Sequence, residues 1–262
     1  MAVRLVVIGG GNMGAALLGG LVAAGWAKPE DLAVVEPVSA RRQQLEEQFP
    51  GVSVAETFEF EADGAVLATK PAQVGEVAAA AGPRVRRLLS IAAGVSTAVI
   101  EGACGRSLPV VRAMPNMPAF VREGASAIAG GTHASDADLD WAESILSSVG
   151  TVVRLPEQLL DAVTGLSGSG PAYVFLLAEA LVDAGVLVGL PRDVSSRLTV
   201  QLLVGSAAML ATGQSPESLR AAVTSPGGTT AAALEVLEDR AIRGALLAAV
   251  RAATDRSREL GA

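Results

Sequence analysis

The sequence predicts an α/β protein, with an N-terminal Rossmann-type doubly wound, mostly parallel sheet followed by an all-helical C-terminal domain. Three observations predict this class. A β-branched apolar run leads straight into a glycine-rich loop near the start of the chain. Strand and helix patterns then alternate to about residue 155, as in a parallel sheet covered by helices. From Pro156 only helical patterns recur, so we expect two domains, 1–155 and 156–262.

The first strand–loop–helix unit carries a dinucleotide-binding pattern. Residues 4–8 predict a buried strand and residues 15–24 an apolar helix. Between them, Gly9, Gly11 and Gly14 fit G-x-G-x-x-G in the context that gives this pattern meaning. The first glycine makes the turn, the second admits a pyrophosphate, and the third lets the helix pack on the strand.

The next strand, residues 32–35, ends in an acidic residue suited to a ribose. Glu36 follows Gly14 by 22 residues, and its carboxylate can take the ribose hydroxyls. Glu36 favours NAD, whereas Ser39, Arg41 or Arg42 could hold the additional phosphate of NADP. The residues alone leave this choice open.

Further strands are expected to bring their exits to one edge of the sheet. After a helix at 40–48, the predicted strands are 52–54, 65–68, 88–92 and 110–114. The carboxyl ends of parallel strands share an edge, where ligands bind in folds of this class. The exits at 69–71, 93–94 and 115–118 should therefore converge there.

The second half reads as a series of helices separated by glycine and proline. Residues 167–172, Ser-Gly-Ser-Gly-Pro-Ala, predict a turn with the proline at a first helical position. The predicted helices are 158–165, 173–188, 194–212, 216–223, 229–238 and 243–260. Glu179 and Asp183 interrupt the most apolar of them, so we expect buried helices and no membrane span. Apolar helices with few charges favour an obligate oligomer.

A second glycine-rich segment, residues 223–230, precedes the fifth of these helices. Its sequence, Val-Thr-Ser-Pro-Gly-Gly-Thr-Thr, combines three hydroxyls (Ser225, Thr229 and Thr230) with free amide groups at a helix start. Such a site favours a carboxylate or phosphate. A well-capped helix after a Pro-Gly turn is the alternative reading.

Composition narrows the function classes. The formal net charge is −7, which gives no basic surface for nucleic acid or anionic lipid. A single cysteine, Cys104, excludes an internal disulfide and a zinc–cysteine cluster, and we predict no metal. His133 is the sole histidine, in a polar turn, and no lysine follows Lys70. Any chemistry in the second half must therefore use hydroxyls, amides and carboxylates.

These segments together resemble pyrroline-5-carboxylate reductase, over essentially the whole chain. The matching segments are Gly9–Gly14, Thr69-Lys70-Pro71, Ala92-Ala93-Gly94, Arg112–Asn116, Asp161–Ala172 and Val223–Thr230. The resemblance implies an oxidoreductase that transfers a hydride from NAD(P)H to the imine carbon of 1-pyrroline-5-carboxylate, giving L-proline in the last step of proline biosynthesis. It also implies a homodimer whose C-terminal helices intertwine, and family members commonly assemble dimers into decamers. The composition agrees with a cytoplasmic protein.

Site residues follow from the same resemblance. The substrate carboxylate would lie on Ser225 and the amides of Gly228 and Thr229, and Thr230 would hydrogen-bond the ring nitrogen as the candidate catalytic residue. NADP is the expected cofactor, with NAD as the alternative. Its contacts and loop would comprise Gly9, Gly11, Asn12, Met13, Gly14, Glu36, Ala68, Lys70, Pro71, Ala93 and Asn116.

Three alternatives are open to the same sequence. A β-hydroxyacid or phosphogluconate-type dehydrogenase shares this architecture but typically needs a catalytic lysine in its second half, which this chain lacks. A dinucleotide sensor would bind cofactor without turnover and would not need the segment 225–230. A purely structural relative would have lost the glycines and threonines that are present here.

Overall fold

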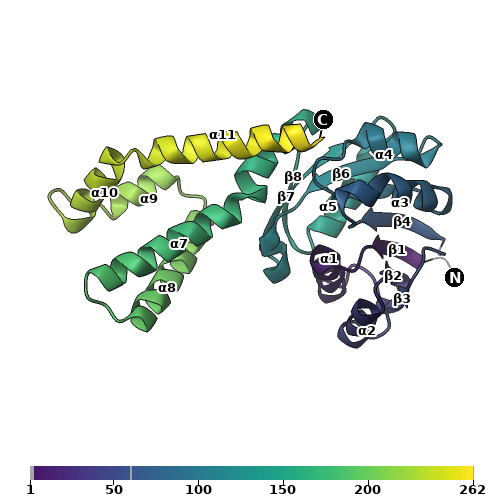
Figure 1. Cartoon of the computed structure of the whole chain (residues 1–262), viewed down its shortest axis with the longest axis horizontal. Coiled ribbons are helices and arrows are strands. Elements are labelled where there is room, and N and C mark those ends of the chain that lie inside the picture. Colours follow the sequence, from purple (N-terminus) through teal and green to yellow (C-terminus); the bar gives the residue numbers. More distant parts are fainter. Residues whose placement is uncertain (1–2, 60, 262) are drawn as a thin grey trace. The chain divides into compact units, whose positions relative to one another are not determined.

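The computed structural model describes residues 3–59 and 61–261. By compactness the chain forms two units, the sheet unit (1–169 with 251–262) and the helical unit (170–250). Figure 1 follows the chain through both. The strands are β1 (Val3–Ile8), β2 (Leu32–Val35), β3 (Ser53–Ala55), β4 (Ala62–Leu67), β5 (Leu88–Ser90), β6 (Val110–Met114), β7 (Gly124–Gly130) and β8 (Gly150–Arg154).

These strands form one eight-stranded sheet in the order β3-β2-β1-β4-β5-β6-β7-β8. All neighbouring pairs are parallel except β6 and β7. The predicted mostly parallel, doubly wound sheet is thus confirmed. The chain crosses from β3 at one edge to β4 on the other side of β1, so the strand order reverses beside β1. Ligands bind at such a reversal in open α/β sheets.

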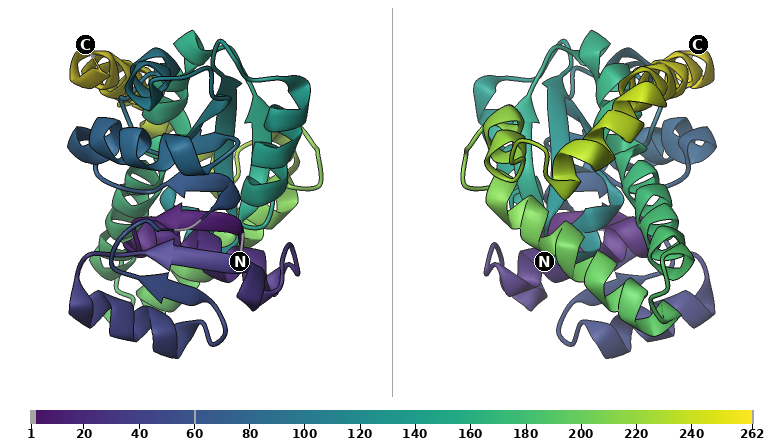
Figure 2. Two further views of the ribbon diagram at one scale, coloured as in Figure 1. Left: turned by 90° about the vertical axis from the view of Figure 1, so that its right-hand side faces the viewer. Right: turned by 90° about the vertical axis from the view of Figure 1, so that its left-hand side faces the viewer.

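Helices cover both faces of the sheet (Figure 2). Helices α1 (Asn12–Ala23), α2 (Ser39–Gln48) and α5 (Asp136–Leu146) pack on one face, where Leu17, Leu18 and Leu45 are fully buried. Helices α3 (Val74–Ala81) and α4 (Thr97–Cys104) pack on the other. The central strands are apolar on both faces because both faces are covered.

The strand exits meet as expected. Ile8 of β1 pairs with Leu67 of β4, and Leu67 with Ser90 of β5, so the loops after these strands emerge together. Ser90 pairs in turn with Arg112 of β6. The glycine-rich loop, the segment after residue 68 and the segment after residue 90 therefore share one sheet edge.

After β8 the described residues form helices joined by turns, with no further strand. The α-helices are α6 (Leu160–Val163), α7 (Gly170–Leu187), α8 (Arg192–Leu210), α9 (Pro216–Ala222), α10 (Thr229–Asp239) and α11 (Ile242–Gly261). Gly189 and Gly213 adopt φ of +102° and +84° where α7 and α8 end. Both helix ends fall where glycine was predicted to stop them.

The turn predicted at residues 167–172 is confirmed only in part: α7 begins at Gly170, which places Pro171 in its first turn as predicted, but Ser167 and Gly168 are helical. A π-helical segment, Thr164–Gly168, precedes α7, and a bend at Ser169 separates the two. Pro171 lacks the N–H that would pair with the Ser167 carbonyl in an α-helix, and that carbonyl instead accepts a bond of 3.0 Å from the Asn116 side chain. A side chain from the exit of β6 thus satisfies the carbonyl that the proline leaves free.

The two compact units divide at 169/170 and 250/251, later than the change in sequence pattern at 155/156. The pattern change itself lies where predicted, because β8 ends at Arg154. Residues 157–169 are helical but pack on the sheet, where Leu160 is buried against Ala127 and Ala129. The two-domain boundary at 155/156 stays a prediction.

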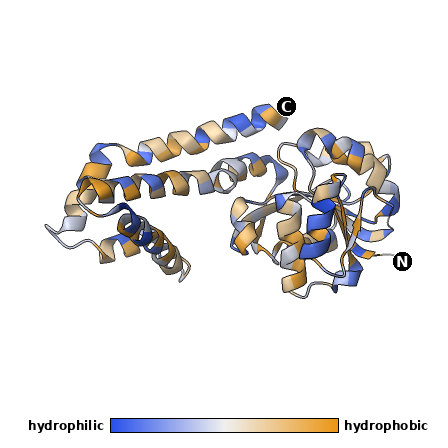
Figure 3. Ribbon diagram, turned by 60° about the horizontal axis from the view of Figure 1, so that its bottom comes forward, coloured by the Kyte–Doolittle hydropathy of each residue, from blue (hydrophilic) through white to orange (hydrophobic). Residues whose placement is uncertain are grey.

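The helical unit leaves most of its apolar side chains uncovered. Helices α7, α9 and α10 contain no buried residue among those described. Leu176 of α7 is 67% exposed and Leu198 of α8 57%, and hydrophobic residues recur along these helices (Figure 3). By length and composition alone, the helical run 157–187 could cross a membrane, and none of its most apolar window is buried. Apolar surface on this scale requires a covering partner.

We predict that Gly64→Ala destabilises the sheet unit. Gly64 lies on β4, where an added Cβ would meet the Trp141 ring of α5. Forcing this helix from the sheet should cost about 1–3 kcal/mol of unfolding free energy. The midpoint of thermal unfolding at fixed protein concentration measures it. Gly75→Ala is the matched control, because its Cβ meets nothing within 4 Å and should leave stability equal or slightly higher.

Candidate active site

The glycine-rich loop is built around close backbone approaches. Gly9 has φ of +107°, and a Cβ there would lie 2.6 Å from the Ala68 carbonyl oxygen. A Cβ on Gly14 would collide with the Gly9 carbonyl. Both positions therefore require glycine for the protein's own packing. A Cβ on Gly11, by contrast, would meet nothing within 4 Å, so the space beside Gly11 is open.

The surroundings of this open space fit a dinucleotide. No side chain caps α1, and its first turn holds no acidic residue. Its N-terminal amides, beginning at the exposed Asn12 and half-buried Met13, can therefore receive a phosphate. The Thr69 hydroxyl, just after β4, is buried without a hydrogen-bond partner. A cradle without side chains and an orphaned hydroxyl both fit the predicted cofactor.

Glu36 lies where predicted, at the end of β2, but its carboxylate turns inward. Its Oε2 accepts the Gly10 N–H at 3.0 Å, and its Oε1 accepts the Val38 N–H at 2.9 Å. The residue is only 8% exposed. The structure thus shows a carboxylate that holds two backbone amides, and its predicted ribose contact stays a prediction.

Arg41 and Arg42 are also engaged with backbone. Arg41 Nε donates to the Gly10 carbonyl at 2.7 Å. Arg42 donates to the carbonyls of Glu36 and Pro37 and forms an exposed ion pair of 2.9 Å with Glu56. Ser39, at the first position of α2, is exposed. These side chains fix the segment between β2 and α2 beside the glycine-rich loop.

The other predicted cofactor residues lie on the neighbouring exits. Ala68 is half-buried directly after β4, and Lys70 and Pro71 are exposed where the next short helical turn begins. Ala93 is exposed after β5. The sheet order therefore brings these residues to the edge that holds the glycine-rich loop.

Both polar atoms of the Asn116 side chain form hydrogen bonds with backbone groups of the protein. It is 9% exposed, its Nδ2 donates to the Ser167 carbonyl at 3.0 Å, and its Oδ1 accepts the Ala125 N–H at 2.8 Å. It therefore ties the exit of β6 to β7 and to the π-helical segment. Its predicted cofactor contact would be additional to these two bonds.

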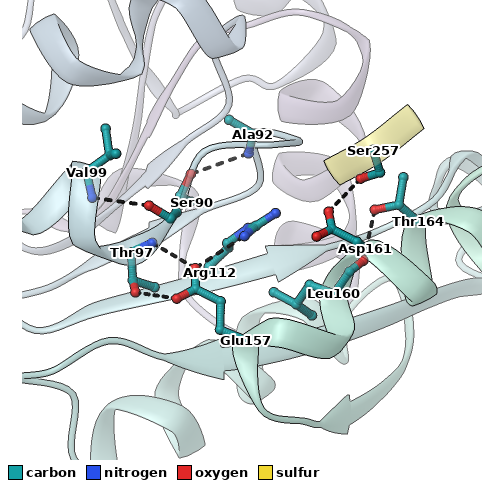
Figure 4. A network of polar contacts seen from close by, with 11 residues as sticks. Ser90, Ala92, Thr97, Val99, Arg112, Glu157, Leu160, Asp161, Thr164 and Ser257 are labelled. Atoms are coloured by element: carbon teal, nitrogen blue, oxygen red, sulfur yellow. Dashed lines mark hydrogen bonds and ion pairs between the residues drawn. The ribbon is translucent and has the colours of Figure 1, made fainter. Parts of the chain in front are cut away.

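A partly buried ion pair at the same edge was missed by the sequence reasoning. Arg112 of β6 is 7% exposed and pairs with Glu157 at 3.2 Å. Glu157 also accepts bonds from the Thr97 N–H at 2.8 Å and the Thr97 hydroxyl at 2.7 Å (Figure 4). The signal was present, because a charged residue inside the apolar run Val-Val-Arg-Ala-Met needs a buried partner.

These contacts lower the pKa of Glu157. Burial alone would raise it, but the bonds from the Thr97 hydroxyl and amide, together with the Arg112 guanidinium, outweigh burial. Glu157 therefore stays charged at neutral pH. It holds the start of α4, and thus the loop after β5, to the chain that follows β8.

The end of α11 closes a small cavity beside this ion pair. Ser257 donates to Asp161 at 2.7 Å, and a Cβ on Gly261 would lie 2.8 Å from the Gly94 carbonyl. The cavity has a volume of about 280 Å³, and Arg112 and Glu157 are among its lining residues. The last turns of the chain therefore support the loop that carries Ala93.

In the helical unit, the predicted substrate segment forms the start of α10. Gly227 has φ of +68°, and no side chain caps the helix, whose first turn holds no acidic residue. Ser225 and Thr229 are exposed and Thr230 is half-buried. This uncapped start can accept an anion.

One amide in this segment is already engaged. The Gly228 N–H donates to the Ser225 carbonyl at 3.0 Å, and a Cβ on Gly228 would collide with the Ser225 hydroxyl. Gly228 therefore leaves space for that hydroxyl, whereas its amide closes the turn. The Thr229 amide and the Ser225 and Thr230 hydroxyls are left as the donors for an anion.

Comparisons with known proteins cover both units. The family described as pyrroline-5-carboxylate reductase dimerisation matches residues 157–260, and the family described as NADP oxidoreductase coenzyme F420-dependent matches residues 4–94. The chain is 43% identical to pyrroline-5-carboxylate reductase of Synechocystis sp., covering 100% of this chain and 99% of the relative. It is 40% identical to that of Corynebacterium melassecola, covering 98% of each.

Solved structures give the same result. The pyrroline-5-carboxylate reductase of Coxiella burnetii aligns with a TM-score of 0.93 at 36% identity and covers 100% of both chains. The pyrroline carboxylate reductase of Plasmodium falciparum, solved with NADP bound, aligns with a TM-score of 0.86 at 31% identity and covers 99% of this chain and 98% of that one.

We predict that Glu157→Gln lowers stability in a pH-dependent way. The folded pKa of Glu157 is lowered, so its contribution is present above its unfolded pKa, near 4.5, and is lost as pH falls through the folded value. The variant should lose about 2 kcal/mol at pH 7. Thermal unfolding of both proteins from pH 8 to pH 3 tests this, and a difference that does not shrink in acid would contradict it.

Proposed function

The chain belongs to the pyrroline-5-carboxylate reductase family, and we propose from this premise how its own residues perform the reaction. The enzyme reduces 1-pyrroline-5-carboxylate to L-proline, the last step of proline biosynthesis. Bound NADPH, or NADH in its place, supplies the hydride for the imine carbon. The match to these relatives over nearly the whole chain is the observation that carries this function.

The sheet unit would hold the cofactor. The open space beside Gly11 and the free amides of α1 would receive the pyrophosphate. Lys70 and Pro71, on the exit of β4, and Ala93, on the exit of β5, would border the nicotinamide half. Asn116 would contact the cofactor from the exit of β6, where the two hydrogen bonds of its side chain to backbone groups fix its orientation.

The helical unit would hold the substrate through the start of α10. The substrate carboxylate would accept bonds from the Ser225 hydroxyl and the Thr229 amide, with the helix dipole adding to the attraction. Gly228 would contribute by leaving room for the Ser225 hydroxyl. Thr230, half-buried one residue into the helix, would hydrogen-bond the ring nitrogen.

The reaction also needs a proton on the ring nitrogen, and this chain can work without a histidine for it. The imine accepts a hydride best when it is protonated, and solvent can protonate it. We assign Thr230 the role of orienting the ring and relaying that proton, because a threonine hydroxyl is itself a poor acid. The lone His133 is exposed in the sheet unit and has no part in this scheme.

We propose that a second copy of the chain covers the apolar helices. The family described as a dimerisation domain matches residues 157–260, so the chain carries an oligomerisation domain. A homodimer through the C-terminal helices would bury the faces of α7 and α8 that are exposed in one chain, with dimers assembling further, up to a decamer. Because a partner would then cover this surface, we propose no membrane span, and a cytoplasmic location.

Turnover separates this function from that of a dinucleotide sensor. We would mix the purified protein with pyrroline-5-carboxylate and follow NADPH and NADH absorbance in parallel. Oxidation of either with proline as product is the expected result, and the ratio of rates gives the cofactor preference. Tight cofactor binding with no oxidation of either would favour the sensor.

We predict that Thr230→Ala lowers kcat about ten- to a hundredfold, because the ring loses its orienting hydroxyl. The dissociation constant for NADPH, measured by fluorescence, should not change. Thr212→Ala, which removes a hydroxyl that donates to the local Met209 carbonyl, is the control and should retain full activity. An unchanged kcat in Thr230→Ala would remove its assigned role.

We predict that Leu176→Glu breaks the assembly. Leu176 is 67% exposed on α7, and a buried unpaired carboxylate at the dimer contact would be strongly unfavourable. Sedimentation velocity should show a smaller species with reduced activity. Val99→Glu, on the 57% exposed Val99 of α4, is the control and should sediment as the unmodified protein does.

A further inference from the structure

The Gly10 peptide group, at the centre of the glycine-rich loop, is held at both ends by side chains from the segment after β2. Its N–H donates to Glu36 Oε2 at 3.0 Å, and its carbonyl accepts Arg41 Nε at 2.7 Å. Gly10 also has no room for a side chain, because a Cβ would collide with Leu45 and lie 3.1 Å from the Glu36 Cβ. The loop is therefore fixed from the side of β2 and α2.

The second carboxylate oxygen of Glu36 is used within its own segment. Oε1 accepts the Val38 N–H at 2.9 Å, which shapes the chain between β2 and α2. With both oxygens bonded and only 8% of the residue exposed, little of the carboxylate faces solvent or an incoming ribose. Its two oxygens accept charge-assisted hydrogen bonds from two backbone amides, and these bonds offset the cost of burying the carboxylate.

We propose that Glu36 is a positioning residue that braces the glycine-rich loop and does not select between NADH and NADPH. This rests on the proposed cofactor site. An acidic residue at the end of this strand ordinarily favours NADH by binding the ribose hydroxyls. A carboxylate that turns inward to Gly10 and Val38 does not repel a 2′-phosphate in that way. The acid at this position is thus compatible with NADPH.

Two substitutions separate a brace from a ribose ligand. Glu36→Gln keeps the shape of the side chain but presents an NH₂ group to one of the two amides, so one bond is lost. Glu36→Asp is one methylene shorter and cannot span both amides. An aspartate serves equally well as a ribose ligand, so Glu36→Asp should retain cofactor selection if Glu36 has that role.

The experiment measures the dissociation constants for NADPH and NADH by protein fluorescence, and the thermal midpoint of the protein without cofactor. If Glu36 is a brace, both substitutions should weaken both cofactors by a similar factor, about three- to tenfold. They should also lower the midpoint by about 2–6 °C in the absence of cofactor. Glu47→Gln, at an exposed glutamate on α2, the helix that follows Glu36, is the matched control and should change neither quantity.

Three results would overturn the inference. One is a change of tenfold or more in the ratio of the two dissociation constants with an unchanged midpoint, which would make Glu36 a ribose ligand. Another is full retention of affinity and midpoint in both variants. The third is an unmodified protein that binds neither cofactor, which would overturn the proposed cofactor site as well. The first two results leave cofactor binding by the unmodified protein intact, so they overturn this inference alone.

Discussion

The structure of the sheet unit depends on one close approach of backbone to backbone. The start of α1 lies so near the end of β1 that a Cβ on Gly14 would collide with the Gly9 carbonyl, and Gly9 itself touches the chain leaving β4. This contact places the N-terminus of α1 at the carboxyl edge of the sheet, beside the reversal of strand order. The open space beside Gly11 is a consequence of that placement.

Polar side chains tie the later sequence to the same edge. Asn116 bonds to the Ser167 carbonyl, Glu157 bonds to Thr97, and Ser257 bonds to Asp161. Each bond joins segments at least 50 residues apart, so together they fix loops that local sequence would leave free. They also explain why the compact sheet unit extends past the last strand to residue 169 and includes the end of α11.

The helical unit, unlike the sheet unit, has no buried apolar core within one chain among its described residues. Its helices have strong local patterns and well-placed glycine stops, yet one chain buries almost none of their apolar side chains. Most of the stability of a helix in a protein comes from packing of its apolar face, and intrinsic helix propensity alone adds little. A second copy that covers these faces would make folding and assembly of this unit one process, and its stability would then depend on protein concentration.

The sequence by itself determined β1 to β6, the helices after Pro156 and the sheet edge on which the predicted cofactor residues lie, because apolar periodicity and glycine spacing are local signals. It predicted β2 at residues 32–35 and the glycine stop after α7. It did not predict the antiparallel strand β7, because the small residues of Gly-Ala-Ser-Ala-Ile-Ala-Gly carry no strong strand pattern.

Only the tertiary structure decided where polar side chains point. The Glu36 carboxylate accepts a bond from the Gly10 N–H. The Asn116 side chain donates to the Ser167 carbonyl, which Pro171 cannot pair with because it has no N–H. Arg112 pairs with Glu157, which lies 45 residues later in the chain. A hydrogen bond depends on the position of a donor contributed by a distant segment, and no local pattern records that position. For this reason the polar residues at this sheet edge could be named from the sequence, and their bonding partners could not.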